Sequence, residues 1–187
     1  MSRLTSRLML ALPLLTVLLL AGSLTTANVA QAVSPYARLF NYNGKCLDMT
    51  GGSTSNGTRP QIWTCNSNDW QYWESVPVSN PLGGAAYLLK NYHSGKCLSI
   101  LDNKTAPGSG VIQYNCNNSG GDLFEDWSPS CPGSYNGYCT WEDVGMEIST
   151  NCCYMHPSGD GSSNGLKIYA SNEPDHLAYR WKWGAHL

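Results

Sequence analysis

Hydrophobic residues follow two different patterns along the chain. Residues 8–20 form a mostly apolar run after Arg3 and Arg7, whereas from residue 33 onward apolar residues come in short runs bounded by Gly, Asn, Ser and Pro. No segment of this later part shows a long apolar period of 3.6 residues. The pattern therefore predicts short strands joined by turns, and an all-β fold, for residues 33–187.

The expected strands are rich in aliphatic and aromatic residues. Three of them open similar stretches of sequence and two lie later in such stretches: 37–40, 86–89 and 145–148, then 61–63 and 167–169. The chain has eleven tyrosines and seven tryptophans against two phenylalanines. Such amphipathic rings suit pleated surfaces that are only half buried.

The later part of the chain also repeats itself. Cys46 and Cys65 enclose the same pattern as Cys97 and Cys116, which lie 51 positions further on. A third, more divergent copy aligns Cys152 with Cys97 and leaves a serine where its second cysteine would stand. Each copy ends in a polar-x-Trp step: Gln71-Tyr72-Trp73, Glu125-Asp126-Trp127 and Tyr179-Arg180-Trp181.

A repeat of about fifty residues, present three times, predicts a closed β structure with three-fold symmetry, because closing the sheet removes its exposed edges. The boundaries fall at about 33–78 (copy one), 79–132 (copy two) and 133–187 (copy three). These three copies form one expected domain.

The first 32 residues are typical of a secretory signal peptide. The two arginines precede the apolar run, and Ala30-Gln31-Ala32 provides small residues for cleavage, with a cut after Ala27 as the alternative. The run is shorter than the roughly 20 residues that span a bilayer. We therefore expect a secreted, extracellular protein without a membrane anchor, beginning at Val33.

The mature chain carries no basic surface of the kind that binds nucleic acid. Without the two leader arginines it has 9 Lys and Arg against 13 Asp and Glu, a net charge of −4. The charge and the absence of a basic stripe argue against nucleic acid as a partner. Nothing in the sequence requires a cofactor.

All eight cysteines lie in the mature part, and an even number in an exported chain indicates disulfides. The repeat pairs four of them within copies, as Cys46–Cys65 and Cys97–Cys116. The other four are Cys131, Cys139, Cys152 and Cys153. A bond between the two adjacent cysteines would close a strained ring, so each is expected to pair with one of the other two. Zinc is not expected, because no ligand spacing typical of zinc is present.

Copy one resembles the ricin-type lectin family, whose fold is a β-trefoil. The resemblance lies in four segments taken in order: Gly44-Lys45-Cys46-Leu47-Asp48, Asn56-Gly57, Gln61-Ile62-Trp63-Thr64-Cys65-Asn66 and Gln71-Tyr72-Trp73. It extends over nearly all of the mature chain, most weakly in copy three. It implies a sugar-binding module, of a kind often attached to secreted glycosidases or toxins.

The resemblance also implies which residues bind sugar. Copy one supplies an aspartate, a glutamine and an aromatic residue at the family's pocket positions, as Asp48, Gln61 and Trp63, but the family's asparagine is replaced by Trp70, with Asp69 before it. A half-exposed carboxylate would accept two sugar hydroxyls, and an indole face would cover the apolar side of a pyranose. The alternative is that the aspartate only bonds a backbone amide near a turn.

The other two copies lack the carboxylate. At the four pocket positions copy two has Ser99, Ile112, Tyr114 and Phe124, and copy three has Tyr154, Lys167, Tyr169 and Ala178. At most one strong site is therefore expected, in copy one. Asp102 and Tyr114 are weaker candidates in copy two.

The leading interpretation is a secreted, monomeric β-trefoil lectin that binds a glycan or polysaccharide and is not an enzyme. One alternative is an inhibitor or toxin-like protein that binds a protein partner through the loop at residues 128–144. Another is a small glycoside hydrolase. The acid pairs Glu125-Asp126 and Glu142-Asp143 are adjacent in sequence and have no positioned partner, which argues against a catalytic pair.

Overall fold

Twelve short β-strands and one α-helix form most of the regular structure in the computed structural model, which describes residues 34–117, 122–159, 161–172 and 177–186. The strands are β1 (Ala37–Asn41), β2 (Cys46–Met49), β3 (Pro60–Trp63), β4 (Tyr72–Val78), β5 (Ala86–Asn91), β6 (Cys97–Ile100), β7 (Ser109–Tyr114), β8 (Asp126–Ser130), β9 (Thr140–Asp143), β10 (Tyr154–Pro157), β11 (Ile168–Ser171) and β12 (Trp181–His186). The α-helix α1 spans Val144–Thr150.

Single-turn 3₁₀ helices occupy several of the connections. They are η1 (Thr50–Gly52), η2 (Asp69–Gln71), η3 (Leu101–Asn103), η4 (Leu123–Glu125), η5 (Gly133–Tyr135) and η6 (Leu177–Tyr179). Three of them, η2, η4 and η6, stand just before the last strand of a copy.

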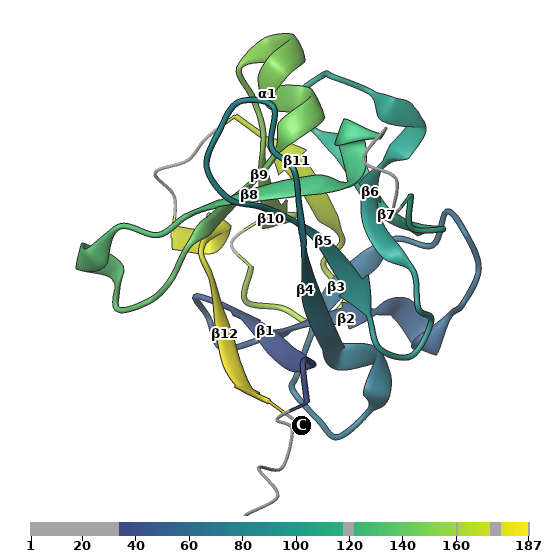
Figure 1. The fold of residues 1–187 in the computed structure, drawn as a ribbon. Coiled ribbons are helices and arrows are strands. Elements are labelled where there is room, and N and C mark those ends of the chain that lie inside the picture. The colour runs from purple at the N-terminus through teal and green to yellow at the C-terminus, as the bar shows by residue number, and fades with distance from the viewer. Residues whose placement is uncertain (1–33, 118–121, 160, 173–176, 187) are drawn as a thin grey trace, which may run out of the picture. The chain divides into compact units, whose positions relative to one another are not determined.

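Six of the strands close into a barrel (Figure 1). Antiparallel pairs run from β12 to β1, β4, β5, β8 and β9. The ring closes between β9 and β12, where Cys139 and Trp181 exchange two backbone hydrogen bonds of 2.7 and 2.8 Å. Closure leaves no free edge on these strands, which is how small antiparallel sheets avoid pairing with other chains.

The other six strands form three hairpins, β2–β3, β6–β7 and β10–β11, one from each copy. The hairpins meet one another, since β7 pairs with β11 and Gln61 of β3 bridges to Lys167. A six-stranded barrel with three such hairpins is a β-trefoil, so the fold expected from the sequence is confirmed.

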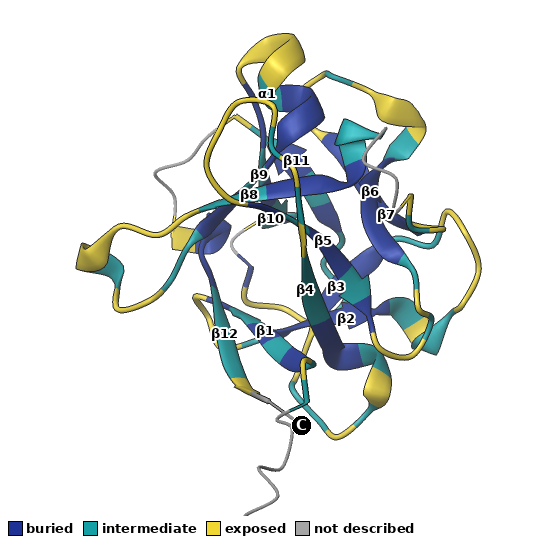
Figure 2. Ribbon diagram, in the orientation of Figure 1, coloured by how far each residue is buried: buried dark blue, intermediate teal, exposed yellow. Residues whose placement is uncertain are grey.

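The centre of the molecule repeats one interaction three times. The tryptophan of each polar-x-Trp step is fully buried, and its indole N–H donates to a backbone carbonyl of the hairpin in its own copy. The pairs are Trp73 with Leu47 (3.0 Å), Trp127 with Leu98 (3.2 Å) and Trp181 with Met155 (2.9 Å). Figure 2 shows this interior as buried strand segments, with the exposed residues mostly in the connecting loops.

These indole–carbonyl bonds correct the expected alignment of copy three. Because Met155 takes the place of Leu47, its neighbour His156 stands where copy one has Asp48. Within β10–β11, His156 pairs with Tyr169, just as Asp48 pairs with Gln61. The alignment of Cys152 with Cys46 is therefore wrong by two residues. The pocket positions assigned to Tyr154, Lys167 and Tyr169 shift with it, whereas Ala178, which is placed by the polar-x-Trp step, does not.

The strand expected at residues 145–148 is also wrong, because this segment belongs to α1. Asp143 precedes the helix and its carboxylate accepts the N–H of Met146 at 2.9 Å. Asn151 ends the helix in the left-handed conformation, and its N–H donates to the carbonyl of Glu147. Asp and Asn are favoured at these two capping positions. Copy three therefore opens with β9, before the helix.

The disulfides follow the repeat in copies one and two but not beyond them. Cys46 is bonded to Cys65 and Cys97 to Cys116, as the repeat predicts. The remaining bonds join Cys131 to Cys139 and Cys152 to Cys153, so the expected cross-pairing of these four cysteines is wrong.

Strand register explains the third bond. The ladder between β8 and β9 ends with Ser130 opposite Thr140, so Cys131 and Cys139 are the next facing pair, with Cα atoms 4.2 Å apart. Cys152 and Cys153 instead lie buried in the core. In the part of the chain that the structure describes, no helix is long and apolar enough to cross a membrane.

Candidate functional site

The hairpin β2–β3 places the three sequence candidates of copy one together. Asp48 lies directly opposite Gln61, and Trp63 follows Gln61 by two residues, so both β3 side chains point to the same face as the aspartate. This face lines a cavity of about 220 Å³, the copy-one cavity. Its lining residues are Asp48, Gly51, Gln61, Trp63, Asn66, Asn68 and Trp70.

Two glutamine amides hold the carboxylate of Asp48. Gln61 Nε2 donates to Oδ1 at 2.9 Å, and Gln71 Nε2 donates to Oδ2 at 2.9 Å. The orientation of each amide is set by its own oxygen: Gln71 Oε1 accepts the N–H of Asn66 at 2.8 Å, and Gln61 Oε1 accepts from Lys167 Nζ at 3.1 Å. The donors of both glutamines are therefore directed at the aspartate.

This network buries the carboxylate, which the sequence suggests would be half exposed. Asp48 is only 3% exposed, because Gln61 and Gln71 cover it. Burial raises the pKa of Asp48 above its ordinary value, while hydrogen bonds from Gln71, Gln61 and Trp70 and the charge of Lys167 act in the opposite direction. The alternative role of bonding a backbone amide does not describe this residue, since its recorded partners are side chains.

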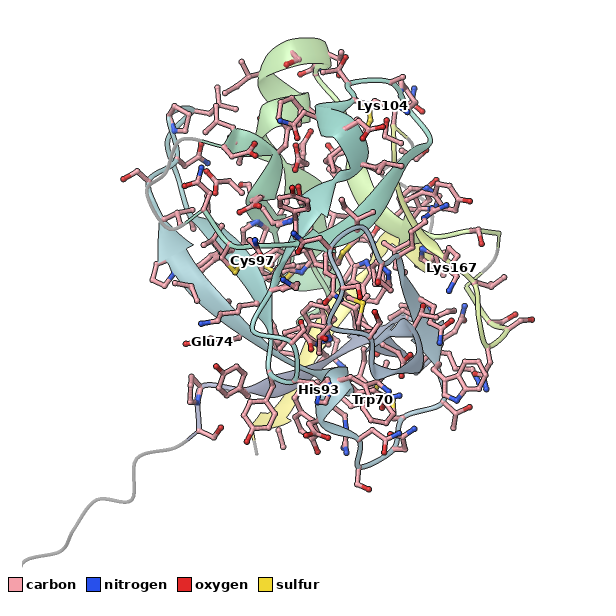
Figure 3. The ribbon with its side chains drawn as sticks, turned by 90° about the vertical axis from the view of Figure 1, so that its right-hand side faces the viewer. Trp70, Glu74, His93, Cys97, Lys104 and Lys167 are labelled. Carbon is pink, nitrogen blue, oxygen red and sulfur yellow. A yellow bond between two sulfur atoms is a disulfide. The ribbon has the colours of Figure 1, made fainter. Side chains whose placement is uncertain are left out.

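Two tryptophans border the copy-one cavity. Trp63 is 39% exposed, a large fraction for a tryptophan, and Trp70 is partly buried. Trp70 packs so closely on Gly52 that a Cβ there would lie 2.9 Å from its ring, and Gly52 has a φ of +64° that favours glycine. On another side Trp70 meets His93 edge to face, with ring centroids 5.8 Å apart. Both side chains are labelled in Figure 3.

Asp69 is not among the residues that line the copy-one cavity. Its carboxylate lies 3.5 Å from Nδ1 of His93 and is largely exposed. The neighbouring Trp70, which stands at the family's asparagine position, lines the cavity instead. Sequence reasoning also did not assign Gly51 or Asn68 to the cavity.

Copy two carries a larger cavity of about 370 Å³. The weaker candidates Asp102 and Tyr114 both line it, together with Ser99, Ile100, Asn103, Ile112 and Asp122. Tyr114 is 48% exposed, while Ser99 at the aspartate position is buried. Asp102 has a φ of +57° and forms an exposed ion pair of 3.4 Å with Lys104.

Copy three replaces the carboxylate network by a stack of rings. His156 stands at the aspartate position and stacks on Tyr179, with centroids 4.4 Å apart and planes 24° apart. Tyr179 occupies the same step as Gln71 in copy one. The contact between these two positions therefore persists in copy three, but without a carboxylate.

Acids that are buried or partly buried lie elsewhere, around β8 and β9. Burial raises the pKa of Asp126 to about 6, with the charge of Asp122 adding to the shift, and raises the pKa of Asp143 well above its ordinary value. Burial, with the charge of Glu147, raises the pKa of Glu142 to about 7. None of Asp126, Glu142 and Asp143 lines the cavities of copies one and two. Among the described residues, no cluster of three or more His, Cys, Asp or Glu side chains could hold a metal ion.

Comparison with known proteins supports the family. Residues 28–114 match the model of the ricin-type beta-trefoil lectin domain-like family. This match takes in the first copy and most of the second. It is 33% identical to an agglutinin of Ricinus communis over 109 residues, which cover 54% of this chain and 16% of the agglutinin. It is 24% identical to beta-galactoside-specific lectin 2 of Viscum album over 156 residues, covering 79% of this chain and 22% of that lectin.

Solved structures share the fold over most of the chain. A designed three-fold symmetric protein, ThreeFoil, aligns with a TM-score of 0.69 at 24% identity, covering 80% of this chain and 98% of ThreeFoil. The ricin B-like lectin of Macrolepiota procera, solved with lactose, aligns with a TM-score of 0.61 at 20% identity, covering 83% and 99%. An exo-beta-1,3-galactanase from Clostridium thermocellum aligns at 0.70 and 24% identity, covering 81% of this chain but 30% of the enzyme.

Proposed function

We propose that this protein is a secreted, monomeric carbohydrate-binding module without catalytic activity, and that its principal site is the copy-one cavity. One observation carries the proposal: a carboxylate, held by two amides, lies in a cavity bordered by a partly exposed indole. This is a fixed hydrogen-bond acceptor beside a flat apolar surface, which is the combination that a sugar ring requires.

The carboxylate of Asp48 has capacity left for a ligand. A carboxylate offers about four lone-pair positions, and the bonds from Gln61, Gln71 and Trp70 occupy three of them. A sugar hydroxyl that enters the cavity takes the remaining position or displaces the indole N–H of Trp70. The buried carboxylate would then form a charge-assisted bond, which is about twice as strong as a neutral one.

The size of the cavity limits the ligand. Its volume of about 220 Å³ is below the roughly 300–1,000 Å³ of pockets for drug-sized ligands. The cavity therefore suits a single pyranose ring, with the rest of a longer glycan outside. The exposed face of Trp63 would cover the apolar C–H groups of that ring.

The identity of the sugar depends on Trp70. One relative is a β-galactoside-specific lectin, and another protein of this fold was solved with lactose. In this chain Trp70 replaces the family's asparagine, so one polar contact to the sugar is exchanged for apolar surface. We infer that the copy-one cavity binds a neutral pyranoside with a broad apolar face more strongly than it binds lactose.

The disulfides support export of the protein. All eight cysteines are bonded in the structure, and disulfides persist mainly in oxidising compartments outside the cytosol. The apolar run at residues 8–20, which lies outside the described residues, provides the expected leader.

A glycan array tests this proposal. The mature chain 33–187 and the variants Trp63→Ala and Tyr114→Ala are each applied to the array. Tyr114→Ala is the matched control, because Tyr114 is the copy-two counterpart of Trp63 and is exposed to a similar degree. The parent should bind a defined group of neutral glycans, Trp63→Ala should lose most of the signal, and Tyr114→Ala should keep it. An array without bound glycans, or equal binding by the parent and Trp63→Ala, would overturn the proposal.

A further inference from the structure

A third cavity lies outside the pocket positions of the three copies. It has a volume of about 420 Å³ and is lined by Tyr42, Ser134, Tyr135, Asn136 and Tyr138. Four of these residues come from the stapled loop, which we define as residues 131–139, closed by the Cys131–Cys139 disulfide. In Figure 1 this loop projects at the left, between β8 and β9, whereas the copy-one hairpin β2–β3 lies at the right.

The stapled loop is anchored to the barrel by cations beneath two of its rings. The guanidinium carbon of Arg180 lies 3.3 Å from the ring centroid of Tyr135, and Arg180 is only 4% exposed. Its Nε and Nη1 atoms have no hydrogen-bond partner among the described residues. A cation–π contact is stronger when the cation is desolvated, so this one fixes the position of Tyr135.

A second cation holds the other end of the loop. Lys182 Nζ donates to the carbonyl of Asn136 at 2.8 Å and lies 5.6 Å from the ring centroid of Tyr138. Tyr138 in turn contacts Tyr42, with centroids 5.4 Å apart and planes inclined by 59°. Together with the disulfide, these contacts order the cavity before any ligand arrives, which reduces the entropy lost on binding.

The chemistry of the lining indicates its ligand. The five side chains supply three phenol hydroxyls, one aliphatic hydroxyl and one amide, and none of them carries a charge at neutral pH. Three rings add flat apolar surface. A neutral molecule with many hydroxyls and an apolar face matches both properties. We propose that this cavity is a second saccharide-binding site, with the stapled loop as its principal wall.

A protein partner fits the cavity less well. Tyrosine, serine and asparagine are also common in protein-binding loops, but a standard protein interface covers about 800 Å² on each side. Here a concave surface formed by five residues is enough to hold a small ligand, as small-molecule sites are typically concave. With the copy-one cavity, the molecule would contact one polysaccharide at two separate places, which raises the avidity.

Residue-resolved NMR tests this inference on the mature chain 33–187. Lactose, cellobiose, maltose and diacetylchitobiose are titrated separately while the resonances of Tyr42, Tyr135 and Tyr138 are followed. At least one saccharide should shift these resonances, and the same shifts should persist in Asp48→Ala, because the two cavities share no lining residue.

A matched pair of variants confirms the location. Tyr42→Ala removes one wall, and Tyr92→Ala changes the corresponding turn of copy two; the two residues are 43% and 48% exposed, so both variants should fold. Tyr42→Ala should weaken binding at the stapled loop by about twofold to tenfold, the range for one aromatic contact, and Tyr92→Ala should leave it unchanged.

The outcomes separate this inference from the proposed function. Shifts confined to the copy-one cavity would overturn the second site and leave the first, while shifts confined to the stapled loop would do the opposite. If none of the four saccharides shifts the three tyrosines, or if the resonances move only when a protein is added, the second site is refuted.

Discussion

Replacement of Asp48 by alanine should change both stability and binding. Without the carboxylate, Gln61 Nε2 loses its acceptor, and Gln71 Nε2 keeps only the carbonyl of Thr64 at 3.2 Å. The oxygens of both amides remain engaged by Lys167 and Asn66. Neither side-chain amide can rotate by half a turn without breaking the hydrogen bond that its oxygen accepts. Asp48→Ala therefore leaves one N–H of each amide unsatisfied, at glutamines that are 8% and 0% exposed.

The cost follows from the two donors. Each buried, unsatisfied donor costs about 1–3 kcal/mol, so the sum is about 2–6 kcal/mol. The native carboxylate is itself desolvated, as the raised pKa of Asp48 indicates, and removing it recovers part of that penalty. We expect the free energy of unfolding to fall by about 2–4 kcal/mol. The affinity for sugar should fall about tenfold to a hundredfold, the value of a charge-assisted bond.

Urea unfolding and calorimetric titration with the strongest array glycan measure the two effects separately. Ser99→Ala is the matched control, because Ser99 occupies the same position in β6 and is buried to a similar degree. It should change stability by less than about 1 kcal/mol and leave affinity unchanged. Unchanged stability of Asp48→Ala would refute the amide network, and unchanged affinity would refute the site. Equal losses in both variants would indicate a purely structural role.

Three further predictions concern the core, the buried acids and the choice of sugar. Trp127→Phe removes the indole bond to Leu98 and leaves a small cavity, so urea unfolding should show a loss of about 2–3 kcal/mol; a loss below about 0.5 kcal/mol would contradict the anchoring role. Burial raises the pKa of Glu142 from 4.5 to about 7, so the folded chain keeps a proton that the unfolded chain releases, and stability should fall as pH rises from about 4.5 to 7. Glu142→Gln should reduce this fall, measured by urea unfolding at several pH values, and an identical pH profile would refute the assignment. Trp70→Asn restores the family's residue and should strengthen lactose binding in calorimetry relative to the parent, whereas weaker binding would argue against Trp70 as the residue that selects the sugar.

The repeat could be recognised from the sequence because its signals are local and chemically distinctive. Tryptophans and turn residues recur at nearly constant spacing in all three copies, and the paired cysteines recur in copies one and two. The alignment of copy three could not be recognised in this way. The residue of copy three that corresponds to Cys46 is Tyr154, and the nearby Cys152 gives an alignment that is wrong by two residues. The true anchor is the indole–carbonyl bond of Trp181 to Met155, which leaves no sequence signal of its own.

The wrong disulfide pairing has a similar cause. The expectation rested on ring strain between two adjacent cysteines, which is a local property of the chain. The bond between Cys131 and Cys139 is instead determined by the register of β8 and β9, which the sequence does not show. The helix α1 was missed even though Asp143 and Asn151, the residues that cap it, stand at its two ends. Both errors arise in copy three and its connection, where the repeat is weakest.

The sequence predicted three of the residues that meet in the copy-one cavity, but not their environment. The sequence brought Asp48, Gln61 and Trp63 together, yet it suggested a half-exposed carboxylate, because the covering Gln71 is 23 positions away. A signal for that contact exists within the repeats. The aspartate and glutamine of copy one change together, to Ser99 with Glu125 in copy two and to His156 with Tyr179 in copy three.

The most direct test of the proposed function is a crystal structure of residues 33–187 with the strongest array glycan. The account predicts a sugar ring on the exposed face of Trp63, with a hydroxyl within hydrogen-bond distance of a carboxylate oxygen of Asp48. A glycan bound elsewhere while the copy-one cavity holds no sugar at saturating concentration would contradict it.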